Sequence, residues 1–89
     1  GGDPYRMRIY GVDGAPVLDQ TFNFQYSGVN IDGDLILLYN DSGCQVFNLN
    51  GVQKFTGSFD FTVSKVSAGR FPGTLLVTGP QMMKEIRLQ

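Results

Sequence analysis

The sequence predicts an all-β protein built from antiparallel strands. Residues rich in Val, Ile, Phe, Tyr and Thr fall in short runs, and no helical period extends beyond one turn. Turn-forming pairs separate these runs: Asp13-Gly14, Asp32-Gly33, Ser42-Gly43, Asn50-Gly51, Pro72-Gly73 and Gly79-Pro80. Such spacing is typical of strands joined by hairpins.

Nine strands are expected, each between two turn signals. In chain order they cover residues 5–11, 17–24, 27–31, 35–40, 44–49, 53–59, 63–68, 74–78 and 84–88. The fourth strand begins with five consecutive apolar residues, Leu35 to Tyr39. A strand that is apolar on both faces must be covered on both faces. We therefore expect this strand to lie between two other layers.

An internal repeat of about 37–40 residues runs along the chain. Residues 9–14 match residues 46–51, and residues 21–24 match residues 58–61, both at an offset of 37. Residues 35–37 match 75–77, and residues 45–46 match 85–86, both at an offset of 40. A repeat of this length with four short strands is typical of a β-propeller blade.

The repeat divides the chain into units. With blade strands labelled a to d, residues 5–24 hold strands c and d, residues 25–61 a full blade, and residues 62–89 a partial blade with strands a to c. Arg87 interrupts the apolar pattern of the last unit, where a terminal repeat is expected to have a polar cap. Residues 1–4, Gly-Gly-Asp-Pro, are interpreted as an expression remnant, a flexible terminus or the cut end of a longer protein.

The segment from Asp32 to Phe55 resembles a quinoprotein-like (PQQ-like) or WD40-like propeller repeat. Phe55 and Leu18 stand where quinoprotein repeats have a docking Trp, and the chain contains no Trp. Residues 75–88 are similar to the C-terminal blade of uncharacterised bacterial membrane-anchored propeller proteins, known only as a domain of unknown function. This resemblance implies a parent protein with a membrane anchor and an extracytoplasmic propeller in the cell envelope.

Composition excludes several classes of function. Seven basic and eight acidic residues give a net charge of −1, without the basic surface that nucleic-acid binding needs. The absence of His removes the usual general base and the commonest metal ligand. Cys44 is the single cysteine, so no intrachain disulfide is possible. The longest apolar run is far shorter than the ~18 residues of a membrane span, so no membrane contact is expected.

Asp41-Ser42-Gly43 matches the active-site motif of aspartic proteases, which pair two such aspartates to activate water. Retroviral-type enzymes of this class are also all-β homodimers of about this length. The residues around the motif differ from that family, since Tyr39-Asn40 precedes it and Cys44 follows it. The repeat instead places the motif in a hairpin turn, which by itself explains Asp and Gly.

Other candidates favour structural roles. Asn30, Asp32 and Asp34 space oxygens like the start of a calcium loop, but the required Gly and distal Glu are missing. Cys44 has no cationic neighbour in sequence, and Met82-Met83 is typical of a gap-filling pair. Four aromatic residues recur in register, which indicates core positions: Phe22, Phe24, Phe59 and Phe61. No catalytic, cofactor-binding or metal-binding residue is predicted.

These observations predict a non-enzymatic β-propeller fragment that serves as a scaffold for a protein or another ligand. Two alternatives stay open: a homodimeric aspartic protease using Asp41, and a self-assembly module. Stacked repeats usually need at least three units to bury a continuous core. The chain is therefore expected to associate with itself when isolated.

Overall fold

The computed structural model of the chain describes residues 5–88, which form nine antiparallel strands and no helix. The strands are β1 (Tyr5–Tyr10), β2 (Pro16–Phe22), β3 (Gly28–Asp32), β4 (Leu35–Tyr39), β5 (Gly43–Asn48), β6 (Gln53–Ser58), β7 (Lys65–Ala68), β8 (Thr74–Thr78) and β9 (Met83–Arg87). The predicted all-β class and the nine strands are confirmed. Within these described residues, no helix is long and apolar enough to cross a membrane. Residues 1–4, the predicted remnant, lie outside the described part.

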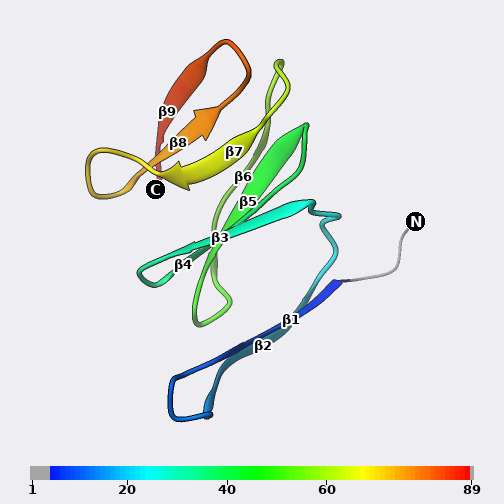
Figure 1. Ribbon diagram of the computed structural model, residues 1–89, viewed down its shortest axis with the longest axis vertical. Coiled ribbons are helices and arrows are strands. Elements are labelled where there is room, and N and C mark those ends of the chain that lie inside the picture. Colours follow the sequence, from blue (N-terminus) through cyan, green and yellow to red (C-terminus); the bar gives the residue numbers. More distant parts are fainter. Residues whose placement is uncertain (1–4, 89) are drawn as a thin grey trace.

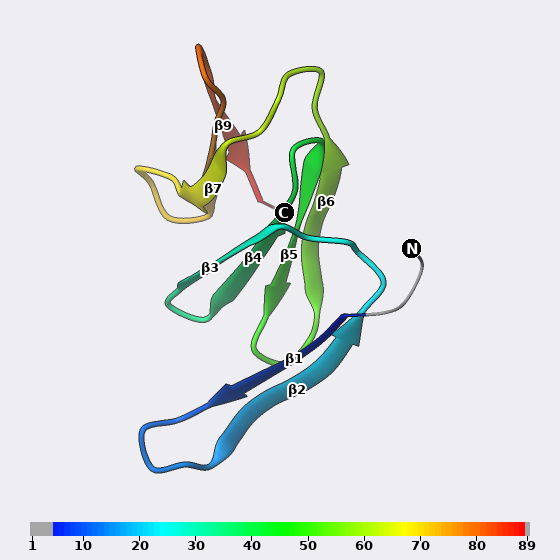
Figure 2. The same ribbon diagram turned by 45° about the vertical axis from the view of Figure 1, so that its right-hand side comes forward.

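The strands form three sheets, and in each sheet the strands follow chain order (Figure 1). We name them the hairpin sheet (β1–β2), the middle sheet (β3–β6) and the C-terminal sheet (β7–β9). The hairpin sheet and the C-terminal sheet lie on opposite sides of the middle sheet, which the turned view in Figure 2 also shows. The middle sheet is therefore the one sheet of the three with a neighbour on each face.

Strand β4 supplies buried side chains to two separate cores. Ile36 and Leu38 pack with residues of the hairpin sheet, including Phe22. Leu37 points the other way and packs with residues of the C-terminal sheet, including Val66. All three β4 side chains are fully buried. The prediction that β4 lies between two other layers is thus confirmed. Its run of apolar residues is continuous because alternate side chains of a strand enter opposite layers.

The repeat is visible in the backbone of the turns. Gly14 and Gly51 lie 37 residues apart, and both have a φ of 82°. The amide of Gly14 donates to the carbonyl of Gly11, and the amide of Gly51 donates to the carbonyl of Asn48, at 3.0 Å in both cases. A positive φ of this size favours glycine, which has no Cβ. The Asp-Gly and Asn-Gly turns therefore repeat as three-dimensional structures as well as sequence.

The sequence alignment of the last repeat is wrong by one residue in β8 and β9. Val29 pairs with Leu38 in the middle sheet, and Val66 pairs with Val77 in the C-terminal sheet. Leu38 therefore corresponds to Val77 at an offset of 39, instead of the predicted 40. The turn between β7 and β8 is therefore two residues longer than the turn between β3 and β4. The predicted offsets of 37 and 40 would make it three residues longer. A shift of one residue exchanges the two faces of a strand. A run of consecutive apolar residues does not determine this register, because it is apolar on both faces in either alignment.

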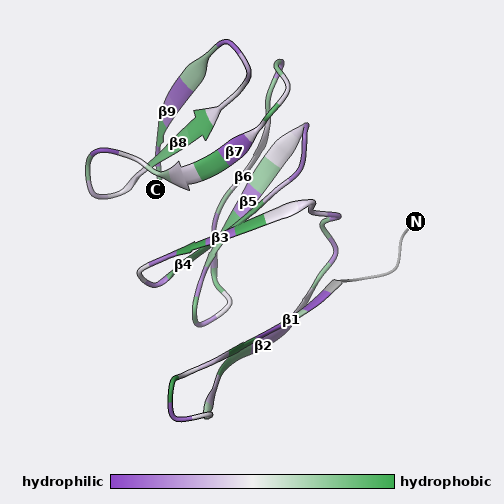
Figure 3. Ribbon diagram, in the orientation of Figure 1, coloured by the Kyte–Doolittle hydropathy of each residue, from purple (hydrophilic) through white to green (hydrophobic). Residues whose placement is uncertain are grey.

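The outer face of the C-terminal sheet is largely polar. Glu85 stands at the repeat position of the fully buried Val46, and its carboxylate lies 3.6 Å from the guanidinium of Arg70. Arg87, the predicted polar cap, is exposed. Part of β9 is accordingly coloured hydrophilic in Figure 3. This face therefore offers little apolar area for a further layer to bury.

The outer face of the hairpin sheet is charged. Arg6 donates two hydrogen bonds to the carboxylate of Asp19, from Nε at 2.8 Å and from Nη2 at 2.7 Å. Arg8 approaches the same carboxylate at 3.9 Å. These hydrogen bonds hold the pKa of Asp19 below its ordinary value, although partial desolvation opposes the effect. Both outer faces of the stack are thus mainly polar, which limits the apolar surface available for association.

Candidate functional site

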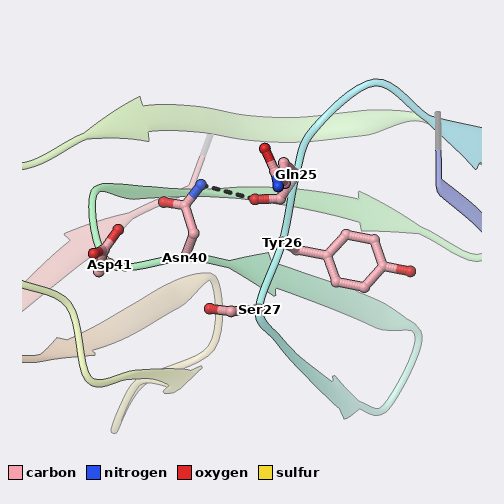
Figure 4. A pocket seen from close by; sticks show the side chains of 5 residues that line it. All are labelled: Gln25, Tyr26, Ser27, Asn40 and Asp41. Carbon is pink, nitrogen blue, oxygen red and sulfur yellow. Dashed lines mark hydrogen bonds between the residues drawn. The ribbon is translucent and has the colours of Figure 1, made fainter. Parts of the chain in front are cut away.

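A hollow of about 410 Å³ opens at one end of the middle sheet. The connection between β2 and β3 and the turn between β4 and β5 form its walls (Figure 4). Its lining residues are mostly polar: Gln25, Tyr26, Ser27, Asn40 and Asp41. Ligand contacts are often made by such loops on a rigid scaffold. None of these residues except Asp41 was a candidate from sequence.

Asn40 holds the two walls of the hollow together. Its Nδ2 donates to the carbonyl oxygen of Gln25 at 3.0 Å, as Figure 4 shows. Its Oδ1 accepts from the backbone amides of Ser42 and Gly43, each at 2.9 Å. The amide of Ser27 adds a hydrogen bond to the carbonyl of Tyr39 at 2.9 Å. These hydrogen bonds fix the two loops relative to each other.

The Asp41-Ser42-Gly43 motif forms the turn between β4 and β5, as its place in the repeat predicts. The Asp41 side chain is exposed, and Ser42 donates to it from Oγ at 3.3 Å. The carbonyl of Asp41 accepts from the amide of Val63 at 3.0 Å. A Cβ on Gly43 would overlap the carbonyl oxygen of Gly57 on the neighbouring strand. Close strand approach and turn geometry thus account for the motif.

A second hollow, of about 330 Å³, lies at the corresponding loops of the C-terminal sheet. Phe61, Thr62, Pro80, Gln81 and Met82 line it. The correspondence is close in the backbone, because the amide of Ser64 donates to Thr78 at 2.7 Å, as that of Ser27 does to Tyr39. The lining differs in chemistry, since Phe61, Pro80 and Met82 are apolar and Pro80 stands at the repeat position of Asp41. One end of the stack therefore has a polar hollow and a more apolar one at equivalent places.

The candidate calcium-loop oxygens are not gathered into one site. Asn30 uses its side-chain amide to donate to the carbonyl of Val66 at 3.2 Å. Asp32 and Asp34 are exposed on either side of Gly33, which closes the turn with a φ of 59°. Among the residues that the structure describes, no group of three or more His, Cys, Asp or Glu side chains is placed to hold a metal ion.

Cys44 lies fully buried in the core between the middle and C-terminal sheets. Burial raises the pKa of its thiol to about 11, because the thiolate loses its hydration there. The thiol is therefore protonated at neutral pH, which makes it a poor nucleophile.

The four recurring aromatic residues pack at core positions of the two repeats. Phe22 is buried with its ring centroid 4.7 Å from that of Phe47, and Phe24 packs against the same core. Phe59 and Phe61 pack against the other core, with their centroids 5.6 Å apart. Of the methionine pair, Met82 lines the second hollow, and Met83 lies exposed on β9.

Comparisons with known proteins identify the family without assigning an activity. A model of a family of unknown function, DUF5711, matches residues 1–88. Neither the curated proteins nor the solved structures contain a match to the chain. The match covers nearly the whole sequence, in agreement with the resemblance of its C-terminal part to proteins known only by a domain of unknown function. The chain belongs to the family of unknown function DUF5711.

Proposed function

We propose that the chain is a non-enzymatic binding scaffold made of propeller-type blades. The observation that supports this most is the stacking of the middle sheet between two sheets at repeat-related positions. In this proposal residues 25–61 form a complete blade, residues 5–24 the outer two strands of the preceding blade, and residues 62–89 the first three strands of the next one. Blades of this kind present loops at their two ends for binding.

The two hollows at the loop end are the proposed binding surface. The polar hollow includes the carboxylate of Asp41, and the neighbouring hollow includes the exposed side chain of Met82. A ligand with a polar or cationic group next to an apolar one matches this pair of hollows. An extended peptide segment has this chemistry. A place in the bacterial cell envelope is part of the proposal through the family resemblance alone.

Binding at this surface can be tested with a defined probe. A pool of decapeptides that combine Lys or Arg with Leu, Phe or Tyr is titrated into the ¹⁵N-labelled protein. The shifted amides are expected to cluster at residues 25–27, 40–42, 61–62 and 80–82. Asp41→Asn and Met82→Gln should both weaken binding, whereas Val12→Ala, at a fully exposed turn position, is the matched control. Shifts confined to other surfaces, or no shifts at millimolar peptide, would contradict the proposed site.

The Asp41→Asn variant also distinguishes a binding scaffold from an acid protease. If Asp41 acted as one of two paired aspartates, a homodimer would cleave peptides at acid pH and Asp41→Asn would abolish the cleavage. The scaffold proposal expects no Asp41-dependent cleavage. Light scattering across protein concentration and pH completes the test. A strict dimer with acid peptidase activity would support the protease.

A further inference from the structure

Val29 and Val66 occupy the same position of the repeat, yet their exposure differs. Val66 on β7 is fully buried, whereas Val29 on β3 is 40% exposed, and Ile31 on the same face of β3 is 49% exposed. Strand β7 packs against β3 and β4 of the preceding sheet. In the part of the chain that the structure describes, the sheet preceding β3 consists of β1 and β2. The exposure of Val29 therefore marks a place where the described hairpin sheet lacks the counterparts of β3 and β4. Ile31 extends the exposed apolar surface next to it, although its own counterpart, Ala68, is exposed as well.

Strand β1 has a free edge at the same place. Its repeat equivalent, β5, pairs with β4 on one side and β6 on the other. Within the described residues, β1 pairs only with β2. An unpaired edge leaves a row of backbone donors and acceptors open to a further strand. The β1 edge and the strip of Val29 and Ile31 together offer hydrogen bonds and an apolar floor.

We propose that this place is a strand-addition site for a β-hairpin of the same repeat type. The second strand of the hairpin pairs antiparallel with β1, as β4 pairs with β5. Its first strand covers Val29, as β3 lies against β7 and Val66 is buried there. This inference deepens the proposed blade arrangement and adds an edge-binding site that is separate from the loop hollows.

The existing repeat specifies the chemistry of the added hairpin. In the β4–β5 pair, Leu37 lies opposite Val46 and faces the next sheet. The equivalent of Val46 on β1 is Ile9, so an apolar residue is expected opposite Ile9 and at alternate positions on either side of it. Asn30 donates to the carbonyl of Val66, so an Asn or Gln on the first strand is expected to donate to the carbonyl of Val29.

The charged face of β1 adds a further requirement. Arg8 points to the outer face and is half exposed, and its distance to Asp19 is 3.9 Å. The position opposite Arg8 in the added strand therefore favours Asp or Glu, because opposite charges across a strand pair are stabilising. A hairpin with a basic residue at that position should bind less well.

The test attaches such a hairpin to the protein. A copy of residues 25–42 is joined directly before Arg6, which reproduces the turn that leads from β4 into β5. The copy includes Leu38→Glu, which places an acidic residue opposite Arg8, because Leu38 pairs with Gln45, the repeat equivalent of Arg8. Alternate amides of β1 that face away from β2 should then exchange with solvent at least about tenfold more slowly, because they acquire carbonyl acceptors. A fusion of the same composition with a scrambled hairpin sequence is the control. Equal exchange in both fusions would overturn the proposal.

A substitution on the apolar strip gives a second readout. Val29→Asp should change the urea midpoint little in the 89-residue chain and lower it strongly in the fusion, where the side chain becomes buried. An equal shift in both proteins would also overturn the proposal.

Light scattering and hydrogen exchange on the 89-residue chain test whether a second copy of the chain occupies the site instead of a hairpin. If β1 becomes protected as the chain dimerises, a second copy fills the site and the hairpin assignment is wrong. Peptide binding at the loop hollows is measured separately, so failure here leaves the scaffold proposal standing.

Discussion

The side-chain amide of Asn30 donates a hydrogen bond to the backbone carbonyl of Val66, across 3.2 Å and between two sheets. The bond joins the first strands of two consecutive repeats, which lie side by side where the sheets meet. It is partly buried, so its loss is not fully compensated by water. Asn30 thus fixes the relative position of the middle and C-terminal sheets.

Replacing Asn30 tests this bond. Asn30→Ala is expected to lower the free energy of unfolding by about 1 kcal/mol, the usual size for one hydrogen bond. Asn30→Asp should lower it further at neutral pH, because a carboxylate then faces a carbonyl oxygen, and less below about pH 4, where the protonated acid can donate. Urea unfolding at both pH values measures the difference. Asn23→Ala, at an exposed position, serves as the control.

The contact between Phe22 and Phe47 should determine how firmly the hairpin sheet is attached. Phe22 is 3% exposed. Phe22→Ala is expected to lower the stability by about 3–5 kcal/mol, through lost burial and a cavity. Hydrogen exchange should show the earliest loss of protection in β1 and β2. Val12→Ala, at a fully exposed turn position, should change stability by less than about 0.5 kcal/mol. Uniform loss of protection over all nine strands would contradict this localisation.

The Asp19 carboxyl should titrate below its ordinary value of 3.8, because Arg6 donates two hydrogen bonds to the charged form. A lowered folded-state pKa means that its contribution to stability is present above pH 3.8 and is lost as the pH falls through the folded value. Side-chain carboxyl NMR can follow the titration directly. Arg6→Gln should return the midpoint toward 3.8, and Arg8→Gln should move it less. An unchanged midpoint in Arg6→Gln would show that the ion pair is absent in solution.

Cys44 should resist modification in the folded protein. With a pKa of about 11, its thiol remains protonated at pH 8 and reacts slowly with a disulfide reagent, whereas denaturant exposes a thiol of ordinary pKa that reacts fast. Because folding raises this pKa, stability should fall as the pH rises from about 9 toward 11. Cys44→Ala should remove that part of the alkaline loss. Rapid modification of the native protein at pH 8 would mean that this core opens readily.

The sequence predicted the strands and the doubly covered β4 because both depend on local information. Turn pairs such as Asp32-Gly33 mark strand ends, and five apolar residues in a row require two apolar neighbours. Two strand ends differ from the prediction by two residues, since β2 ends at Phe22 and β7 begins at Lys65, and all the other ends agree to within one residue. The residues before β7 instead bond to the β4–β5 turn, through the amides of Phe59 and Val63.

The register of the last repeat and the positions of the two loop hollows could not be predicted from the sequence. Every residue in the run Leu75-Leu76-Val77 is apolar, so an alignment shifted by one position matches the pattern equally well. The shift nevertheless decides which side chains are buried. The lining of the first hollow combines two connections 13 or more residues apart, at Gln25–Ser27 and Asn40–Asp41. Asn40 and its counterpart Gly79 both lie against the preceding connection, at Gln25 and at Thr62.

The position of the middle sheet between two layers has a consequence for how the chain unfolds. The hairpin sheet and the C-terminal sheet each depend on the middle sheet for their apolar contacts. Cooperativity in such a stack passes between nearest neighbours. Either outer layer can therefore detach while the other two stay folded, but disruption of β4 removes the contacts of both at once. Force or denaturant applied at one end should thus release the layers in sequence, and the central strand sets the last barrier.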